Sequence, residues 1–459
     1  MKKWLDKIER AMLWVLPFVV FFAYYPVIKL GANEQMNFEL SLPLIWLALF
    51  GGISILRFPR ILRRFKLKQL WILGLFPITA TLSVVWSRNF VRGFLEAGIL
   101  DLLFVCGLNI LSLRPSKAEV AKFAKLHVFG GAIASVICLV QCFLDVFGVP
   151  KNISLLCPGC GYQVFGFPHP NGLAIEPQFM GNLLIAPALL SLYFAYNTIV
   201  SKSSKRQILL AIGLSFLNIM ALYICFSRGA IYAFILSLVL FVVLSAKKAK
   251  QKNILFLVYF GVSFLGFSTG LLCQGVLAEF STTSESFPQG IARAVHHLSL
   301  GKIDFRQKEA PAPSAEGEAA IFDGYIEEST EIRLGLNEAA FKTWSEDADT
   351  IINGVGLGGA GVAIHEKIDY YSEKEIVQNQ FLSILLELGV IGCLSLLVTL
   401  SVIIWSTYRF GASAFFWALL LAYIVSLNFF SGLPNVLHIY LLAPLWMRLG
   451  AHNKYAKIG

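Results

Sequence analysis

Apolar runs long enough to cross a lipid bilayer recur along almost the whole chain. A helix needs about 20 apolar residues to cross roughly 30 Å of hydrocarbon. Only 14% of the 459 residues are charged, which is too few for a water-soluble surface. We therefore predict an all-α polytopic membrane protein with about twelve transmembrane helices. Their expected ranges are 11–30, 41–56, 70–86, 94–112, 126–147, 174–196, 207–226, 229–246, 254–273, 380–405, 412–430 and 436–449.

The distribution of positive charge predicts how these spans are oriented. A net charge of +10 would suggest a nucleic-acid partner in a soluble protein. Here, however, most of the 38 lysines and arginines lie in the two termini and in every second connector between the runs. The segment RFPRILRRFKLK (57–68) is the most basic of these connectors. This is the positive-inside pattern. We expect both termini in the cytoplasm of a bacterium, membrane lipids around the spans, and no nucleic-acid partner.

One connector differs from all the others. The region 274–379 contains no span-length apolar run, and its residues 274–378 hold 18 acidic against 8 basic side chains. It divides the chain into nine spans (1–273), a large extracytoplasmic loop (274–379) and three further spans (380–459). The loop is of low complexity over 281–320 and better organised over 325–367, where apolar residues recur at helical spacing before the glycine-rich stretch NGVGLGGAG.

Cys157 and Cys160 form a C-P-G-C stretch in a polar connector. A disulfide across a tight turn and a pair of free thiols are both compatible with this pattern. A metal site would need a second Cys/His pair nearby, and the connector offers only a lone histidine, His169. We therefore predict neither a metal site nor a cofactor.

Arg228 lies at the outer junction of two apolar runs, in the stretch FSRGA. An arginine at such a depth costs about 2.5–3.5 kcal/mol unless it is paired or hydrated. It either snorkels to the outer headgroups or binds a phosphate through its planar guanidinium. Because it stands between Ser227 and Gly229 on the side that is poor in positive charge, we favour phosphate binding.

Three further arginines fall on the outer side, namely Arg88, Arg92 and Arg333. Arg333 taken alone is also compatible with an ordinary solvated arginine on a helix rich in glutamate. Together with Arg228, these residues predict an electropositive pocket that faces the outer leaflet and suits an anionic lipid substrate.

Two glutamates and an amide pair complete the candidate residues. Glu176 lies near the outer end of one apolar run, and Glu387 lies inside another. Carboxyl groups in such positions mark functional sites or polar contacts between packed helices. Gln378 and Asn379 stand directly before the run that contains Glu387. We expect Gln378, Asn379 and Glu176 to shape the acceptor side of the site.

The order of these motifs resembles the O-antigen ligase and polymerase family. The motifs are Ser227-Arg228-Gly229-Ala230 at an outer span end, an R-x(10)-W helix from Arg333 to Trp344, a G-x-G-x-G-G turn, and an asparagine followed by x(9)-G-x-x-G. The resemblance covers most of the chain, including the position of the large loop. Each motif is degenerate by itself, and the specificity comes from their order and topology.

The resemblance implies a GT-C-like membrane glycosyltransferase. Such an enzyme is metal-independent and inverting, and it uses a polyprenyl (undecaprenyl) diphosphate-linked glycan as donor on the outer side of the inner membrane. Arg228 and Arg333 would bind the diphosphate. The ligase branch has a basic histidine where this chain has Gln378, and an amide cannot accept a proton at neutral pH. His365 or Glu331 are the alternative bases that we consider.

Three other functions remain open at this stage. A polymerase of O-antigen or exopolysaccharide and a protein O-oligosaccharyltransferase would share the family's motifs, since the acceptor is chosen by loop shape. A non-enzymatic transporter of lipid-linked glycans would need polar residues at mid-depth, whereas the polar residues here gather at the outer face. The acceptor is therefore a glycan, a lipid or a protein.

Overall fold

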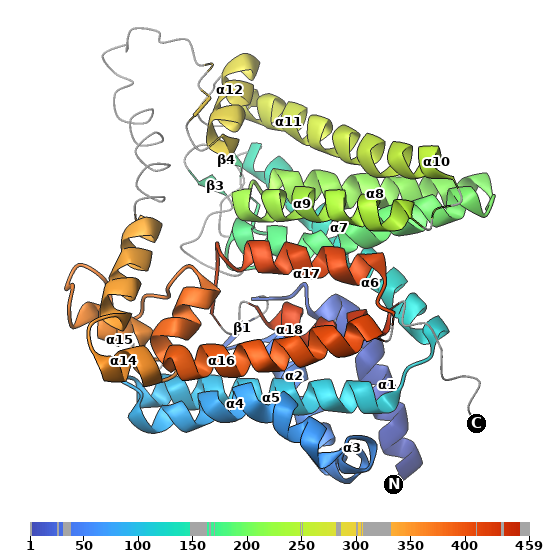
Figure 1. Ribbon diagram of the computed structural model, residues 1–459. Coiled ribbons are helices and arrows are strands. Elements are labelled where there is room, and N and C mark those ends of the chain that lie inside the picture. Colours follow the sequence, from blue (N-terminus) through green and yellow to red (C-terminus); the bar gives the residue numbers. More distant parts are fainter. Residues whose placement is uncertain are drawn as a thin grey trace, which may run out of the picture.

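The computed structural model describes residues 2–24, 27–30, 38–146, 163–164, 167–168, 170–247, 249, 251–280, 286–299, 302–303, 305, 332–409, 411–432 and 436–449. Nearly all of this chain is helical (Figure 1).

Eight helices among the described residues are long and apolar enough to cross a membrane. The protein is thus a multi-pass membrane protein, and each of these helices matches one predicted run. They are α4 (Leu67–Ser83, continued by the turn η2, Val84–Trp86), α5 (Phe90–Leu113), α6 (Lys117–Val146), α7 (Pro177–Val200), α8 (Lys205–Ile224), α9 (Arg228–Ala246), α11 (Val262–Phe280, preceded by α10, Lys252–Phe256, and the π-helical turn η4, Leu257–Gly261) and α16 (Gln380–Arg409).

The remaining predicted spans differ from simple membrane helices. α2 (Leu42–Leu56) and α3 (Phe58–Arg64) meet at a bend of 68° and count as a ninth span only if the pair is taken together. α17 (Ala414–Ser426) has 13 residues and α18 (Leu437–Arg448) has 12. A perpendicular crossing needs about 20 residues, so neither of these two helices crosses the full hydrocarbon thickness alone.

The prediction of one helix over 11–30 is wrong. α1 (Lys2–Val19) begins in the charged N-terminal segment and ends well before residue 30, and β1 (Val27–Leu30) follows as a strand. β1 pairs antiparallel with β2 (Phe38–Ser41), with Val27 opposite Ser41. The β-branched residues that follow Pro26 in the sequence favour the extended conformation. A second short antiparallel pair joins β3 (Gln163–Val164) to β4 (Phe167–Pro168).

The large loop packs at one end of the helix bundle, and the described chain ends lie at the other (Figure 1). Just before α5 begins, the N–H of Arg88 donates to the carbonyl of Val355 in the loop at 3.1 Å. At the other end of α5, the carbonyl of Leu111 accepts from Arg448 of α18 at 3.0 Å. The first turns of α1 are tied to that same end, since Arg60 of α3 binds both Glu9 and Asn109.

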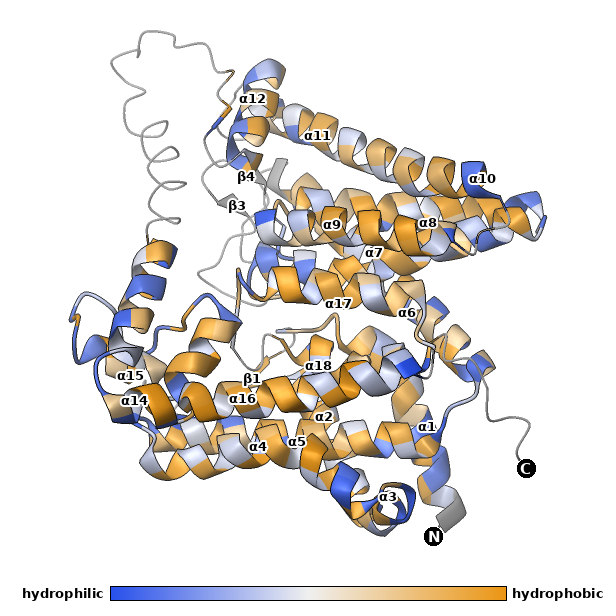
Figure 2. Ribbon diagram, viewed as in Figure 1, coloured by the Kyte–Doolittle hydropathy of each residue, from blue (hydrophilic) through white to orange (hydrophobic). Residues whose placement is uncertain are grey.

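The long helices consist mainly of apolar residues along their length, and polar residues gather near their ends (Figure 2). Large apolar side chains such as Phe94, Phe264 and Leu397 are 64%, 74% and 58% exposed. Side chains of this kind on a soluble protein would form an aggregating surface, so they face lipid here. The main core lies inside, where α7 is the most enclosed helix.

The described part of the loop contains its own small core. Residues 332–344 are helical, and two short helices follow, α14 (Ala348–Asn353) and α15 (Ala360–His365). Leu336, Ala340 and Ile364 pack together with Leu386 of α16. A further helix, α12 (Phe287–Leu298), packs against α11 at the same end of the bundle. The predicted helix around Arg333 is thus present from residue 332.

Helix α16 is broken near its start. Gly389 has φ 60° and ψ −164°, a backbone conformation that essentially only glycine adopts. Residues 380–388 therefore form a short helix whose direction is set separately from that of the long membrane-crossing part.

Candidate functional site

The glycine-rich stretch 354–361 forms the seam between the loop and the membrane helices. Its backbone is bonded on two sides: the N–H groups of Val355 and Gly356 donate to the carbonyls of Leu386 and Glu387, both at 2.9 Å. A Cβ on Gly354 would lie 2.4 Å from the carbonyl carbon of Glu387. The glycine-rich stretch is therefore a close-packed turn.

The other side of the turn contacts the connection between α4 and α5. Ser83 Oγ accepts from the Leu357 N–H at 3.1 Å, and Ser87 Oγ donates to the Leu357 carbonyl at 2.7 Å. A Cβ on Gly93 would meet the same carbonyl at 2.3 Å. The loop is thereby held against both α5 and α16.

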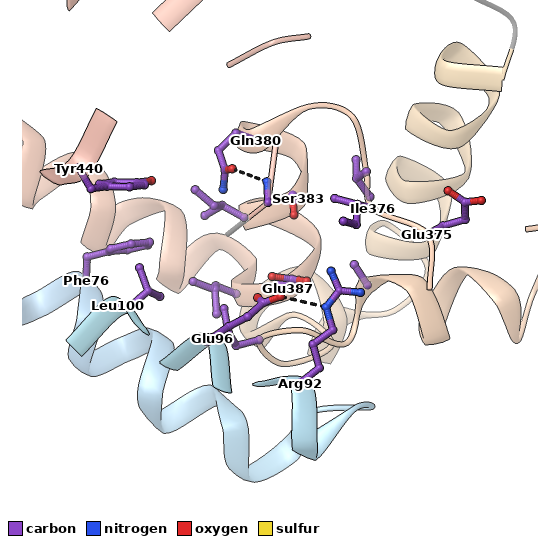
Figure 3. Close-up of a pocket in the computed structure, with 16 residues that line it drawn as sticks. Phe76, Arg92, Glu96, Leu100, Glu375, Ile376, Gln380, Ser383, Glu387 and Tyr440 are labelled. Carbon is purple, nitrogen blue, oxygen red and sulfur yellow. Dashed lines mark hydrogen bonds and ion pairs between the residues drawn. The ribbon is translucent and has the colours of Figure 1, made fainter. Parts of the chain in front are cut away.

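Beside this seam lies a pocket between α4, α5, α16, α18 and the loop segment 375–377 (Figure 3). We call it the acidic pocket. Tyr440 and Phe76 enter it from one side, while Arg92, Glu96 and Glu387 gather at the other (Figure 3). The full lining comprises Phe76, Arg92, Glu96, Leu100, Leu357, Ala360, Glu375, Ile376, Val377, Gln380, Ser383, Ile384, Glu387, Leu388, Gly432 and Tyr440.

The polar centre of the acidic pocket is one guanidinium between two carboxyl groups. Arg92 Nε donates to Glu96 Oε1 at 2.9 Å, one helical turn further along α5. Glu387 is 8% exposed and interacts with the charges of both side chains. The backbone N–H groups of Gly358 and Ala360 donate to the carboxyl group of Glu387. The glycine-rich turn thus provides hydrogen bonds that water would otherwise make to this buried group.

A second polar cluster lies at the N-terminal ends of α7 and α9, and we call it the arginine site. Arg333 Nη2 donates to Gln178 Oε1 at 3.2 Å, which brings the loop helix to the first turn of α7. Glu176 immediately precedes α7 and interacts with the charge of Arg333. Surrounding protein atoms raise the pKa of Glu176 above its ordinary value, and the guanidinium of Arg333 partly offsets this rise.

The turn between α8 and α9 brings Arg228 to the same end of α7. Phe226 adopts φ 55°, an unusual left-handed conformation for an aromatic residue, and the ring of His297 from α12 stacks on it at 4.8 Å. Ser227 then caps α9 by accepting from the Ala230 N–H, and Arg228 is the first residue of the helix. A Cβ on Gly181 of α7 would lie 3.0 Å from Ser227 Cβ.

The connection between α17 and α18 separates the two clusters. The Gly432 N–H donates to Gln380 Oε1 of the acidic pocket at 3.0 Å, as drawn in Figure 3. On the other side, Phe430 packs edge-on against Phe179 of α7 at 5.6 Å, and Phe429 lies against Gly229 of α9. The two clusters are therefore distinct sites on either side of one short segment.

Several predicted site residues lie elsewhere at this end of the bundle. Asn379 Oδ1 accepts from the N–H groups of Phe381 and Leu382, so its side chain caps α16. Gln378 stands just before it and is half-buried. Arg88 is exposed and pairs with Glu366 of the loop at 2.8 Å. It does not line the pocket.

His365 ends α15, and its ring is held inside the loop. Nδ1 lies 2.6 Å from the carbonyl of Tyr371, and Nε2 lies 3.6 Å from Asp369. A carbonyl oxygen only accepts, so Nδ1 carries the proton. Glu331, Cys157 and Cys160 fall outside the described residues. Within the described ranges, no three His, Cys, Asp or Glu side chains stand close enough together to hold a metal ion.

Two residues that sequence reasoning missed connect those that it found. Gln178 is the partner of Arg333, and it stands two positions after Glu176. Glu96 is the partner of Arg92 and stands four positions after it, the spacing at which side chains meet on one helix face. Both signals were present in the sequence as polar residues next to candidates already identified.

Comparison of the chain with models of known protein families and with curated proteins found no match.

Proposed function

We propose that the protein is a metal-independent, inverting glycosyltransferase that moves a glycan from a polyprenyl (undecaprenyl) diphosphate carrier to an acceptor. The observation that supports this most directly is the meeting of Arg333, Gln178 and Glu176 beside the start of α9, where Arg228 stands. The loop and the membrane helices thus contribute one arginine each to the same end of the bundle.

The proposal includes a topology. We propose about twelve passages or partial passages through the bacterial inner membrane, with both termini in the cytoplasm and the large loop outside. The basic connector 57–68 and the salt bridges that join α3 to α1 lie at the end of the bundle opposite to the loop. Positive charge at one end and an acidic loop at the other follow the positive-inside rule.

Diphosphate binding is the chemistry that two arginines at a membrane interface favour. A guanidinium can bind phosphate oxygens through two parallel hydrogen bonds. When the glycosidic bond to the carrier breaks, negative charge accumulates on the departing diphosphate, and fixed cations stabilise that charge. We propose this role for Arg228 and Arg333, with Gln178 orienting Arg333.

The acceptor hydroxyl must lose a proton as the new bond forms, and general-base help contributes about 10²–10⁴-fold. Gln378 is an amide and orients at most. His365 has the chemistry of a base, since its Nε2 is free of the proton when Nδ1 holds it. We propose His365 as the residue to test first.

The test is a transfer assay with purified protein, a polyprenyl-diphosphate glycan, and a panel of glycan, lipid and peptide acceptors. We expect Arg228→Ala and Arg333→Ala each to slow transfer by about 10²–10³-fold, the usual cost of losing one group that stabilises developing charge. Lys342→Ala is the matched control, because Lys342 is an exposed cation on the same helical segment as Arg333 and pairs with the exposed Glu338. It should transfer at the wild-type rate.

Two other results would be informative. If the donor binds but no acceptor gives product, the enzyme assignment fails in favour of a carrier or transporter of the lipid-linked glycan. If His365→Ala transfers normally while both arginine variants are slow, the base lies elsewhere and the diphosphate role stands. The acceptor that gives product decides between ligase, polymerase and protein O-oligosaccharyltransferase.

A further inference from the structure

We infer that the acidic pocket is a subsite for an uncharged sugar, and that it receives the hydroxyl-bearing edge of the acceptor. The inference deepens the proposed function, because it names the chemical class of the acceptor. Its evidence comes from a part of the molecule that the arginine site does not include.

The charges of the pocket exclude an anionic group. Its only arginine, Arg92, is bonded to Glu96 and faces Glu387 as well. Glu375 adds a third carboxylate at the rim, pointing away from the centre in Figure 3. A phosphate or carboxylate that entered would meet carboxyl groups and no surplus cation among the described residues, and an anion taken out of water without a cation beside it binds poorly.

The same groups are well suited to hydroxyls. A carboxylate accepts up to about four hydrogen bonds, and backbone donors occupy only part of the capacity of Glu387. Ser383 and Tyr440 add hydroxyl groups of their own, and Gln380 uses its carbonyl oxygen on Gly432 while its amide nitrogen remains a donor. A sugar edge presents donors and acceptors side by side, which this mixture can satisfy.

The aromatic side of the pocket supports the same assignment. Phe76 and Tyr440 project into the cavity opposite to the carboxyl groups (Figure 3). A sugar ring has apolar C–H faces as well as polar edges, so an aromatic wall on one side and polar groups on the other match its two surfaces. This is the usual composition of small-molecule pockets, with apolar walls and a few fixed polar groups.

The size of the pocket limits how much of the ligand enters. The enclosed volume is about 40 Å³, whereas one water needs about 10–15 Å³ of such volume. The enclosed part therefore holds two or three hydroxyl groups of one sugar edge, and the rest of the acceptor lies at the mouth, beside Glu375 and Ile376.

The position of the pocket joins it to the proposed donor site. Gln380 lines the pocket and bonds to Leu427 and Gly432, the ends of the short segment whose Phe429 and Phe430 pack on α9 and α7. The pocket and the proposed donor site thus lie on opposite sides of one short segment that contacts both.

The test first measures binding alone, on the full-length protein in lipid nanodiscs, by saturation-transfer NMR. The probes are glucose and glucose 6-phosphate, which differ by one phosphate. We expect the neutral sugar to bind at least tenfold more tightly than the phosphate. Glu387→Gln should weaken neutral-sugar binding up to about tenfold, the loss expected for one well-formed hydrogen bond. Glu338→Gln, at an exposed carboxyl group on the loop helix, should have no effect.

Tyr440→Phe provides a second variant that keeps the packing and removes only a hydroxyl. It should weaken binding about threefold to tenfold. Equal or tighter binding of glucose 6-phosphate overturns the inference, as does unchanged binding in both folded variants. If Glu387→Gln proves to be unfolded in a thermal melt, Tyr440→Phe decides alone.

The transfer assay separates this inference from the proposed function. In a working assay, Glu387→Gln should raise the KM for a neutral acceptor about tenfold and leave the KM for the donor unchanged. If no transfer occurs with any acceptor but the neutral sugar still binds through Glu387, the proposed function fails and the sugar site stands. If transfer proceeds and the acceptor KM does not change, the inference fails and the enzyme stands.

Discussion

The arginine site and the acidic pocket lie at the same end of the bundle, and the same loop contributes to both, yet it does so in different ways. At the acidic pocket the glycine-rich turn is held by backbone hydrogen bonds to α16 and to the connection before α5. At the arginine site the loop makes its contacts through side chains, among them the hydrogen bond from Arg333 to Gln178 and the stacking of His297 on Phe226. The backbone of the loop is thus built into the pocket, whereas side chains connect the loop to the arginine site.

This contrast suggests a division of labour. A site made by backbone packing keeps its shape with and without ligand, which suits recognition of one sugar edge. A site completed by side chains can open and close at lower cost than one made by backbone hydrogen bonds, which suits the entry and exit of a bulky lipid carrier. The comparison makes predictions for each side that differ in kind as well as in size.

The largest effect should come from removing both sites at once. The double variant Arg333→Ala/Glu387→Gln should lose about 10³–10⁴-fold in kcat/KM for a neutral acceptor, because separate sites contribute independent free energies. The measurement is a double-mutant cycle in the transfer assay. A loss no greater than that of Arg333→Ala alone would mean that the two clusters act as one unit.

Gly354→Ala should disrupt the backbone packing that forms the acidic pocket. Gly354 has φ 73° and ψ −178°, where a residue other than glycine costs about 1–3 kcal/mol, and the added methyl would meet Glu387 at 2.4 Å. We expect a destabilisation of about 3 kcal/mol and loss of neutral-sugar binding, measured by thermal melting and by NMR.

Gly98→Ala is the matched control for this prediction. Gly98 lies in α5, and no atom stands within 4 Å of an added Cβ. Alanine at that position should leave the melting temperature unchanged or slightly higher, because it favours helix over glycine. A comparable loss in both variants would show that the turn is no more demanding than an ordinary helical position.

Glu176→Gln probes the electrostatics of the arginine site. The folded-state pKa of Glu176 is raised, so the charged carboxylate destabilises the fold as the pH rises above the unfolded-state value of about 4.3. The variant should therefore be more stable than the wild type at neutral pH, by less than about 1 kcal/mol given the exposure of the side chain, and equally stable near pH 3. A variant that is less stable at neutral pH would contradict the raised pKa.

The smallest effect is expected for Arg88→Ala. Its ion pair with Glu366 is exposed on both sides, and such pairs contribute about 0–1 kcal/mol. Melting temperature, sugar binding and donor binding should all stay close to those of the wild type. A strong loss of donor binding would restore Arg88 to the arginine site, where sequence reasoning had placed it.

The long membrane helices were predictable because lipid leaves a chain little choice. Backbone groups in hydrocarbon must be paired within the segment, so runs such as 174–196 and 207–226 become helices with nearly the expected limits. The predicted limits of the helices were wrong where the residues do not lie in the hydrocarbon. Val27 and Ile28 pair with a neighbouring strand, and the apolar run 41–56 forms a helix of only 15 residues, which bends by 68° into the basic helix α3.

The sequence predicted which residues belong to the candidate sites, but it did not predict which of them lie together. The order of motifs identified Arg228, Arg333 and Glu387 as candidates, but it combined all outer arginines into one electropositive pocket. The structure divides them, because Glu96 bonds Arg92 and Glu366 bonds Arg88. Which carboxylate neutralises which arginine depends on tertiary packing through the glycine-rich turn, and no local pattern encodes it.

The break at Gly389 also divides α16 into two parts that are under different evolutionary constraints. Residues 380–388 carry Gln380, Ser383 and Glu387, whereas the remainder exposes side chains such as Leu394 and Leu397 to lipid. Lipid accepts almost any apolar side chain, so the second part is free to drift as the membrane composition of the host changes. The short first part can meanwhile keep its wall of polar groups, and a new ligand preference can evolve there without a redesign of the transmembrane anchor.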